Sequence, residues 1–311
     1  MLAVLRERLA SKQVVAEAIV ILVNAANGQQ GRLLIPKLLA AGQQIRACVR
    51  SEESAAMLRD VGVAEVVVGN IDDPELIARA VRGIATIYHV CPGIQPDERQ
   101  IGLMWIDFAR REGVRHFVFS SVLHAVLADL VQHEIKRDIE EYLLSSGLEF
   151  TILQPTIYMA PRRFNAVIDK GVLRAGWSLD RVQSLVDIGD VTDVACKVLL
   201  EGNAHAAATY ELAGRERLTA RSMAAIIGEV TGRPVQVEQI DADSYLTGLF
   251  GNRDWSTMPH EASVGRSLSS RYSSHDFLGN PNVLTWLLGR EPTTFAQFVL
   301  AQVGLAKVSG I

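Results

Sequence analysis

Cysteine is scarce in this chain: three occur among 311 residues, far apart at Cys48, Cys91 and Cys196. An odd number of widely spaced cysteines supports neither a disulfide framework nor a cysteine-based zinc cluster. Two catalytic signatures are also missing. There is no Gly-x-Ser-x-Gly turn, and His133-Glu134 has no second histidine at His-Glu-x-x-His spacing. These absences argue against a disulfide-stabilised module, a serine hydrolase and a zinc protease, and they indicate no metal site.

Long apolar runs and an excess of basic charge are missing as well. No run approaches the roughly 20 apolar residues that cross a bilayer. Residues 1–18 are interrupted by charges and show no signal-peptide pattern, although Leu2, Leu5 and Leu9 are spaced as on a short amphipathic helix. The net charge of −4 gives no general attraction to nucleic acid or to an anionic membrane. We therefore expect a cytoplasmic protein whose partner is a small molecule or another protein.

A strand, a tight turn and a helix are predicted at the start of the remaining chain. The sequence VILVNAANGQQG at 20–31 is an apolar run that ends in small and turn-forming residues, and an apolar-periodic stretch follows at 32–41. Glycine lets the backbone approach a dinucleotide pyrophosphate, and a helix N-terminus favours its charge. Ala25 replaces the first glycine of the usual fingerprint. The candidate contacts at this turn are Asn27, Gly28, Gln29, Gln30 and Gly31.

Arg50 follows the next predicted strand, at 44–49. An acidic residue at this place binds the ribose 2′-hydroxyl of NAD(H), whereas an arginine supplies charge-assisted hydrogen bonds to the 2′-phosphate of NADP(H). We therefore expect NADP(H) in preference to NAD(H). The alternative is that Arg50 is an ordinary solvated surface residue.

Strands and helices then alternate regularly along the chain. Further strands are predicted at 64–68, 85–90, 116–120 and 148–153, and helices between them at 75–82, 96–112 and 131–145. This alternation predicts an α/β fold with a doubly wound parallel sheet of the Rossmann type. Ligands bind such sheets at the carboxyl ends of the strands. The candidate cofactor contacts there are Ile71, Asp72, Val90, Cys91, Pro92, Ser120, Pro155, Ile157 and Tyr158.

Two of these positions carry alternative interpretations. Cys91 is either a reactive thiol or a small apolar wall beside the cofactor. Ser120 and Ser121 place hydroxyls at the sheet edge, where they either bind substrate or cofactor or serve only as loop residues. Asp72 and Asp73 precede Pro74, a pattern typical of a helix cap rather than of a catalytic acid.

The alternation fades after residue 160. Strands are predicted at 184–188, 209–212 and 235–240, and a helix at 190–200 capped by Asp190. The stretch 252–275 is rich in Ser, Arg and Gly without a clear period, so it is interpreted as a long loop. The predicted organisation is an N-terminal extension at 1–18, a dinucleotide-binding domain at 19–160, and a smaller α+β C-terminal lobe at 161–311 interleaved with it.

These residues resemble the NmrA-like family within the atypical short-chain dehydrogenase/reductase superfamily. The matching stretches are 23–31, 69–74, 87–93 with 96–98, HFVFSSVLH at 116–124, Lys136 with 140–143, FTILQP at 150–155, 210–212 and 287–290. The resemblance implies a Rossmann domain with a small C-terminal lobe and NADP(H) at the carboxyl edge of the sheet. It further implies either reduction of a quinone- or carbonyl-type molecule or redox sensing without catalysis.

The Tyr-x-x-x-Lys pair of that superfamily is incomplete here. Lys136 is present, but the position four residues earlier is Gln132, and an amide does not donate a proton as a phenol does. Lys136 is then expected to bind the nicotinamide ribose, unless it is simply a solvated lysine. Quinones suit such a site, because their reduced oxygens take a proton from water or a weak donor. The candidate catalytic or orienting groups are Ser121, His124, His133, Lys136 and Tyr158.

Two functions follow from these features. We favour an NADPH-dependent reductase, with hydride transfer to a quinone- or carbonyl-type small molecule. The alternative is a redox sensor that binds NADP(H) and acts through a regulatory protein partner. Both predict binding of the nucleotide, so only turnover separates them. An oligomer is compatible with either function.

Overall fold

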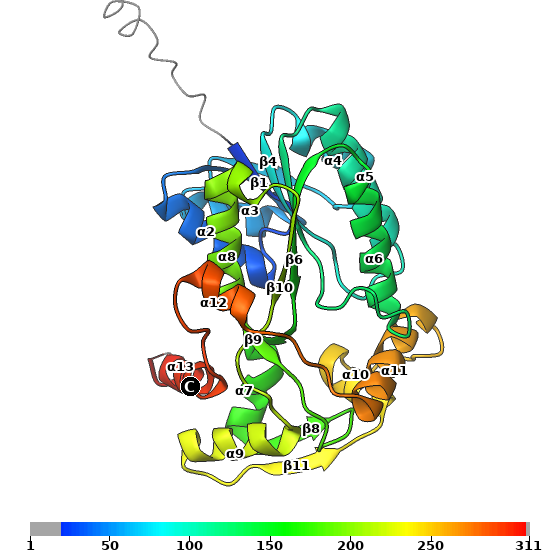
Figure 1. Ribbon diagram of the computed structural model, residues 1–311, viewed down its shortest axis with the longest axis vertical. Helices are drawn as coiled ribbons and strands as arrows, with labels where there is room; N and C mark the ends of the chain where they lie inside the picture. The colour runs from blue at the N-terminus through cyan, green and yellow to red at the C-terminus, as the bar shows by residue number, and fades with distance from the viewer. Residues whose placement is uncertain (1–19, 309–311) are drawn as a thin grey trace, which may run out of the picture.

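The computed structural model describes residues 20–308, and the predicted extension at 1–18 with its amphipathic helix lies outside this range. A seven-stranded sheet in the order β10-β6-β5-β4-β1-β2-β3 forms the centre of the molecule, and all its strands pair in parallel (Figure 1). The strands are β1 Val20–Val23, β2 Gln44–Val49, β3 Glu65–Val68, β4 Thr86–Val90, β5 His116–Ser120, β6 Glu149–Pro155 and β10 Ala208–Leu212. The doubly wound parallel sheet predicted from the alternating pattern is confirmed. Its order reverses between β1 and β4, which is where such sheets bind ligands.

Helices cover both faces of the sheet, and each face has its own core. One core packs beneath α2 Gln29–Ala40, α3 Glu52–Asp60, α8 Ile188–Glu201 and α12 Asn282–Leu288. The other packs beneath α4 Pro74–Val81, α5 Glu98–Arg111 and α6 Val131–Leu144. In Figure 1 the two helix layers stand on opposite sides of the sheet. The carboxyl edge therefore lies between an α2/α8 side and an α5/α6 side.

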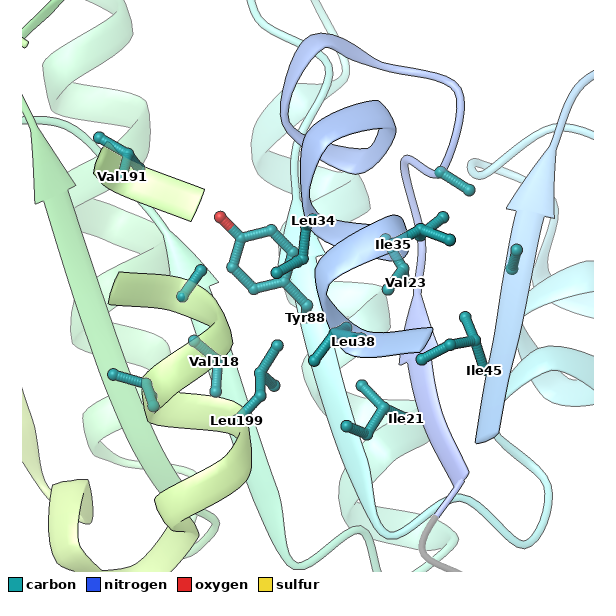
Figure 2. Close-up of a cluster of buried hydrophobic side chains, with 14 of the residues drawn as sticks. Ile21, Val23, Leu34, Ile35, Leu38, Ile45, Tyr88, Val118, Val191 and Leu199 are labelled. Carbon is teal, nitrogen blue, oxygen red and sulfur yellow. The ribbon is translucent and has the colours of Figure 1, made fainter. Parts of the chain in front are cut away.

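The alternation of side chains along β1 explains how one strand serves both cores. Ile21 and Val23 belong to the α2/α8 core, and Leu22 belongs to the α5/α6 core. On α2, Leu34, Ile35 and Leu38 form one apolar stripe against the sheet (Figure 2). Full burial of each such side chain contributes roughly 1.5–3 kcal/mol to stability. These contacts hold the N-terminus of α2 at the carboxyl end of β1.

Figure 2 also shows the ring of Tyr88, from β4, between α2 and α8, with its hydroxyl directed along the sheet toward Val191. The Tyr88 side chain is fully buried in this core. Its hydroxyl therefore needs a hydrogen-bond partner within the protein on the α2/α8 side.

The chain returns to the main sheet after leaving it. Strand β10 pairs in parallel with β6, from Ala208 opposite Thr151 to Leu212 opposite Pro155. The sequence pattern predicted this strand but not its place as the seventh strand of the main sheet. Helix α8, just before it, packs on α2 and covers the sheet.

The C-terminal lobe lies beyond the carboxyl edge of the sheet (Figure 1). It contains α7 Pro161–Lys170, α9 Ala220–Thr231, α13 Phe295–Val308, and two small parallel ribbons. The ribbons join β8 Val172–Ala175 to β11 Gln236–Gln239, and β7 Ile157–Met159 to β9 Leu185–Asp187. A third apolar cluster holds these elements together and includes Phe164, Trp177, Phe277 and Phe295.

The prediction of a long loop at 252–275 was wrong. Helix α11 occupies Pro259–Ser274 and packs against α10 Ala242–Phe250. Three of its four buried residues, Ala262, Val264 and Gly265, are small, and a Cβ on Gly265 would lie 2.4 Å from the Leu246 side chain. Close packing of small residues replaces the large apolar stripe that periodicity detects. The abundant Ser, Arg and Gly therefore concealed a helix.

The predicted cap of the helix at 190–200 was also wrong. Helix α8 begins earlier, and the carboxylate of Asp187 accepts hydrogen bonds from the amides of Gly189 and Asp190 at 2.7 and 3.3 Å. Asp190 instead fixes the C-terminal segment, because its buried carboxylate accepts from the Arg290 guanidinium at 2.7 Å and from the Thr293 amide at 2.7 Å. At the start of α4, the capping residue is Asp73 rather than Asp72.

Candidate functional site

The turn between β1 and α2 forms without its first glycine. Ala25 has no positive φ, so an ordinary residue adopts that conformation without strain. Gly31 is required instead: a Cβ there would lie 2.4 Å from the carbonyl oxygens of both Ala25 and Ala26. Gly28 caps α2, and no acidic residue stands in the first helical turn. The free amides at this helix N-terminus therefore face the sheet edge with no negative side chain beside them.

Two arginines lie at the β2 side of this turn. The Arg32 guanidinium donates to the Asn27 carbonyl at 3.0 Å and to its side-chain oxygen at 2.7 Å. The Asn27 amide donates in turn to the Ser54 hydroxyl at 2.8 Å. Arg50 is exposed, and no described residue bonds its side chain. The sequence indicated Arg50 but missed Arg32, whose place in the first turn of α2, next to Gly31, was the available signal.

An asparagine at the end of β1 fixes the carboxyl end of β4. Asn24 accepts from the Val90 amide at 2.8 Å, so its side-chain nitrogen is the end that faces His89 Nδ1, at 2.9 Å. His89 Nδ1 therefore accepts, and His89 Nε2 carries the proton toward Cys91 Sγ at 3.1 Å. Burial, aided by the nearby Lys136 charge, lowers the pKa of His89 to about 3. This histidine is neutral at physiological pH.

Cys91 is a buried thiol in this arrangement. Burial raises its pKa to about 12, against the opposing effect of the Lys136 ammonium. A protonated, enclosed thiol is a poor nucleophile. The structure therefore argues against the reactive-thiol interpretation of Cys91, and its place beside the cofactor stays a prediction.

A buried ion pair lies on the α5/α6 side of the edge. Lys136 Nζ lies 2.7 Å from Glu98 Oε1, and their side chains are 7% and 0% exposed. The ammonium also stands 5.2 Å above the centre of the Phe119 ring. Burial alone would lower the pKa of Lys136, but the Glu98 carboxylate reverses the shift and the pKa is raised. Lys136 is therefore a fixed cation and not the solvated lysine of the alternative interpretation.

Unsatisfied polar atoms accompany this pair. Glu98 Oε2 is buried without a hydrogen-bond partner, and so is the side-chain oxygen Oε1 of Gln132, the residue at the position of the missing tyrosine. Glu140 lies one helical turn after Lys136 on α6, and both of its carboxylate oxygens accept from the Gln154 amide, at 2.9 and 3.0 Å. Burial raises the pKa of Glu140. Buried acceptors without donors are uncommon in folded proteins, so Glu98 Oε2 and Gln132 Oε1 are distinctive features of this side of the edge.

A second polar cluster lies on the α2/α8 side. The Gln30 amide nitrogen donates to Ser120 Oγ and to Tyr158 Oη, both at 3.0 Å. Its oxygen accepts from Ser120 at 3.2 Å and from the Tyr88 phenol. Burial raises the pKa of Tyr158 far above the physiological range. Three predicted site residues, Gln30, Ser120 and Tyr158, are thus brought together, and Tyr88 is the member that the sequence missed.

The two candidate histidines lie beyond β5, against the C-terminal lobe. His133 Nδ1 donates to the His124 carbonyl at 3.0 Å, and burial lowers the pKa of His133 to about 4. His124 Nε2 bonds the Leu278 carbonyl at 2.8 Å. Both rings pack on Phe277, with centroid distances of 5.6 Å for His124 and 5.9 Å for His133. A neutral, buried His133 is a poor acid at neutral pH.

The remaining predicted contacts are distributed along the same edge. Ile71 offers its carbonyl to Trp105 at 2.9 Å, while Asp72 is exposed at the β3 end of the sheet. Pro92 and Ile157 are half-buried, and the Pro155 carbonyl accepts from the Leu123 amide at 2.9 Å. Ser121 is buried directly after β5. Ile71 and Asp72 therefore lie toward the arginine end, and the others toward the end that carries Lys136 and Tyr158.

Other candidate features lie elsewhere or are absent from residues 20–308. An open hollow of about 800 Å³ between α10 and α11 is lined by residues such as Asp243, Trp255 and Arg266, none of them a predicted site residue. Within the described range, no three His, Cys, Asp or Glu side chains are grouped as metal ligands. No helix in that range combines the length and apolarity needed to cross a bilayer.

Known proteins share both the sequence pattern and the fold. A (4-alkanoyl-5-oxo-2,5-dihydrofuran-3-yl)methyl phosphate reductase of Streptomyces griseus is 31% identical over 235 residues, which are 74% of this chain and 80% of that protein. An NAD(P)H azoreductase of Xenophilus azovorans is 26% identical over 295 residues, covering 90% and 97% of the two chains. The crystal structure of an NADPH-dependent quinone oxidoreductase from Escherichia coli, in complex with NADPH, superimposes with a TM-score of 0.75 at 23% identity, covering 91% of this chain and 99% of that one.

A model of the NmrA-like family matches residues 17–265 of the chain. That range includes the glycine turn, Arg50, the Glu98–Lys136 pair and the Gln30 cluster. The resemblance first indicated by scattered motifs thus extends over most of the chain. The protein belongs to the NmrA-like family.

Proposed function

We propose that the protein is an NADPH-dependent reductase that transfers hydride to a quinone- or carbonyl-type small molecule. One observation carries this proposal. An exposed arginine, a glycine turn at a helix N-terminus and a buried, charged lysine lie along a single sheet edge, in the order in which a dinucleotide presents its 2′-phosphate, its pyrophosphate and its nicotinamide ribose. The reductase names of the relatives agree with it.

The residues present fit NADP(H). Gly28 and Gly31 leave the amides of α2 open to a pyrophosphate. Arg50, with Arg32 beside it, supplies the charge that a 2′-phosphate requires. At the other end, Lys136 has ammonium hydrogens beyond the one directed at Glu98, and these are suited to ribose hydroxyls. The unsatisfied Gln132 oxygen nearby is a further acceptor for a hydroxyl.

When bound, the cofactor supplies the hydride, and the protein contributes position and electrostatics. The groups that surround Lys136 donate protons poorly: His133 is neutral, and Gln132 stands where the superfamily has tyrosine. Such a site favours an acceptor whose reduced oxygen takes its proton from water. Quinones have this property, whereas simple ketones require an acid within the site. The positive field of Lys136 stabilises charge that develops on the acceptor.

The test is NADPH oxidation with a panel of quinones and ketones. We expect turnover with quinones well above the protein-free rate and little with ketones. Lys136→Met should lower kcat/KM, whereas Lys197→Met, at a helix surface beside α12, should leave it unchanged. Tight NADPH binding without turnover of any acceptor would contradict the reductase proposal and favour a regulator that acts through a protein partner.

A further inference from the structure

The Gln30 cluster is a second functional group on the sheet edge, separate from the Lys136 pair. We infer that Tyr158, oriented by Gln30 and Tyr88, holds the nicotinamide end of the cofactor by donating a hydrogen bond to the carboxamide oxygen. This inference rests on the proposed function, because it requires that NADP(H) occupies the edge. It assigns Tyr158 to the cofactor and not to the reducible substrate, and it makes Gln30 and Tyr88 positioning residues.

Gln30 uses its whole hydrogen-bonding capacity within the cluster. A primary amide has two N–H donors and two acceptor lone pairs. The donors are directed at Ser120 and Tyr158, and the oxygen accepts from Tyr88 and Ser120. Only 8% of Gln30 is exposed. The saturated amide therefore fixes how the hydroxyl groups of Ser120, Tyr88 and Tyr158 are arranged around it.

Tyr88 sets that direction. Its side chain has no solvent exposure, and its phenol donates to the Gln30 oxygen. The Gln30 oxygen therefore faces Tyr88, and the nitrogen faces Tyr158. Tyr158 accepts this bond, so its own proton is directed elsewhere, and Ser120 also lies close to the phenol. Tyr158 as a residue is half-buried, so it borders the edge, where a bound acceptor would compete with Ser120 for this proton.

The position of Gln30 identifies the bound group as part of the cofactor. Gln30 lies inside the phosphate turn, between Gly28 and Gly31, so its partners lie next to whatever the turn anchors. Tyr158 packs against the α2/α8 core, whereas Lys136 and His133 stand on the α5/α6 side. A nicotinamide ring held at the edge between these two sides would have Tyr158 on the side of the turn.

The chemistry of the phenol agrees with a donor to a neutral carbonyl. Burial raises the pKa of Tyr158, so the phenol keeps its proton throughout the neutral range. A phenol of this kind gives up its proton reluctantly but donates a good hydrogen bond. The carboxamide oxygen is a neutral acceptor, so it needs a hydrogen-bond donor but no proton transfer.

The experiment measures the affinities of NADP⁺, thionicotinamide-NADP⁺ and adenosine 2′,5′-bisphosphate for the wild type and for Tyr158→Phe, Gln30→Leu and Tyr88→Phe. Sulfur in place of the carboxamide oxygen removes a good acceptor, and the bisphosphate lacks the nicotinamide half. We expect the wild type to bind NADP⁺ about 5- to 10-fold more tightly than the thio analogue, as one hydrogen bond provides. Tyr158→Phe should abolish this preference, Gln30→Leu and Tyr88→Phe should reduce it, and bisphosphate affinity should stay constant.

Tyr210→Phe is the matched control, because the phenol of Tyr210, on β10, bonds the His205 ring and has no hydrogen bond to the cluster. Its preference for NADP⁺ should equal that of the wild type. If Tyr158→Phe keeps the wild-type preference, or if the wild type shows none, the inference is overturned while the proposed function stands. If the wild type binds neither NADP⁺ nor the bisphosphate, the proposed function itself fails.

Discussion

The ammonium of Lys136 and the carboxylate of Glu98 form an ion pair 2.7 Å long that is almost completely withdrawn from water. The two residues come from different helices, α6 and α5, and meet at the sheet edge. The pair holds a positive charge at one defined place, where a flexible surface lysine would not remain.

Removal of the Glu98 charge should therefore destabilise the protein strongly. Glu98→Gln leaves a buried ammonium without its counter-charge, and we expect the free energy of unfolding to fall by about 3–5 kcal/mol. Urea denaturation measures this change. Glu238→Gln, which breaks the exposed ion pair with Arg174, is the control and should cost less than about 1 kcal/mol. Equal effects of the two substitutions would contradict the importance of burial.

Arg50 should determine the preference for the phosphorylated nucleotide. Arg50→Ala removes charge-assisted hydrogen bonds, so we expect NADPH affinity to fall by roughly 10- to 100-fold and NADH affinity to change little. Fluorescence titration with both nucleotides measures the effect. Arg82→Ala, an exposed arginine at the start of the loop before β4, is the control. Parallel losses for NADPH and NADH would refute the assignment of Arg50 to the 2′-phosphate.

Gly31 should tolerate no side chain. In Gly31→Ala the new methyl group meets two backbone carbonyl oxygens at 2.4 Å, so the turn has to shift, and we expect a loss of roughly 1–3 kcal/mol. Thermal unfolding and NADPH titration should both show the damage. Gly248→Ala is the control, because nothing lies within 4 Å of a Cβ there and alanine favours a helix. Wild-type stability of Gly31→Ala would show that the turn is looser than the structure indicates.

Buried neutral histidines should make the fold sensitive to acid. The pKa of His89 falls to about 3 and that of His133 to about 4 on folding, below the value of about 6.5 in an unfolded chain. Folding thus favours the neutral form, and this contribution is complete above pH 6.5 and is lost as the pH falls from 6.5 toward those values. In that interval each histidine lowers the free energy of unfolding by up to about 1.4 kcal/mol for every pH unit of acidification.

The measurement is the free energy of unfolding from pH 7 to pH 5 for the wild type and for His89→Gln. The variant should lose less stability across the interval, although it starts from a lower value. His275→Gln, at an exposed position, should keep the wild-type slope. A wild-type slope in His89→Gln would mean that His89 does not control the acid response.

Local pattern was sufficient for much of the main sheet. Apolar runs at 20–23, 44–49 and 116–120, with turn residues after them, predicted strands where β1, β2 and β5 lie. Parallel strands separated by helices place their carboxyl ends at one edge, so the pattern also predicted that Gly28, Arg50 and Ser120 share that edge. These inferences succeed because strand and helix periodicity are properties of neighbouring residues.

Pattern failed where small residues or distant partners decide the structure. Helix α11 packs through Gly265 and Ala262, which carry no periodic apolar signal. The partner of β10 lies on β6, more than fifty residues earlier in the chain. No local rule selects that pairing, because it depends on which sheet edge is still open when the chain returns.

By itself, then, the sequence determined the alternation of strands and helices, the glycine turn and several of the polar residues at the sheet edge, although not Arg32, Tyr88 or Glu98. Tertiary structure alone decided how those residues are grouped: Lys136 with Glu98 on one side of the edge, and Tyr158 with Gln30 and Tyr88 on the other. The physical reason is that secondary structure follows from contacts a few residues apart. A buried charge or a saturated amide, in contrast, acquires its partners only when separate helices and strands exclude water around it.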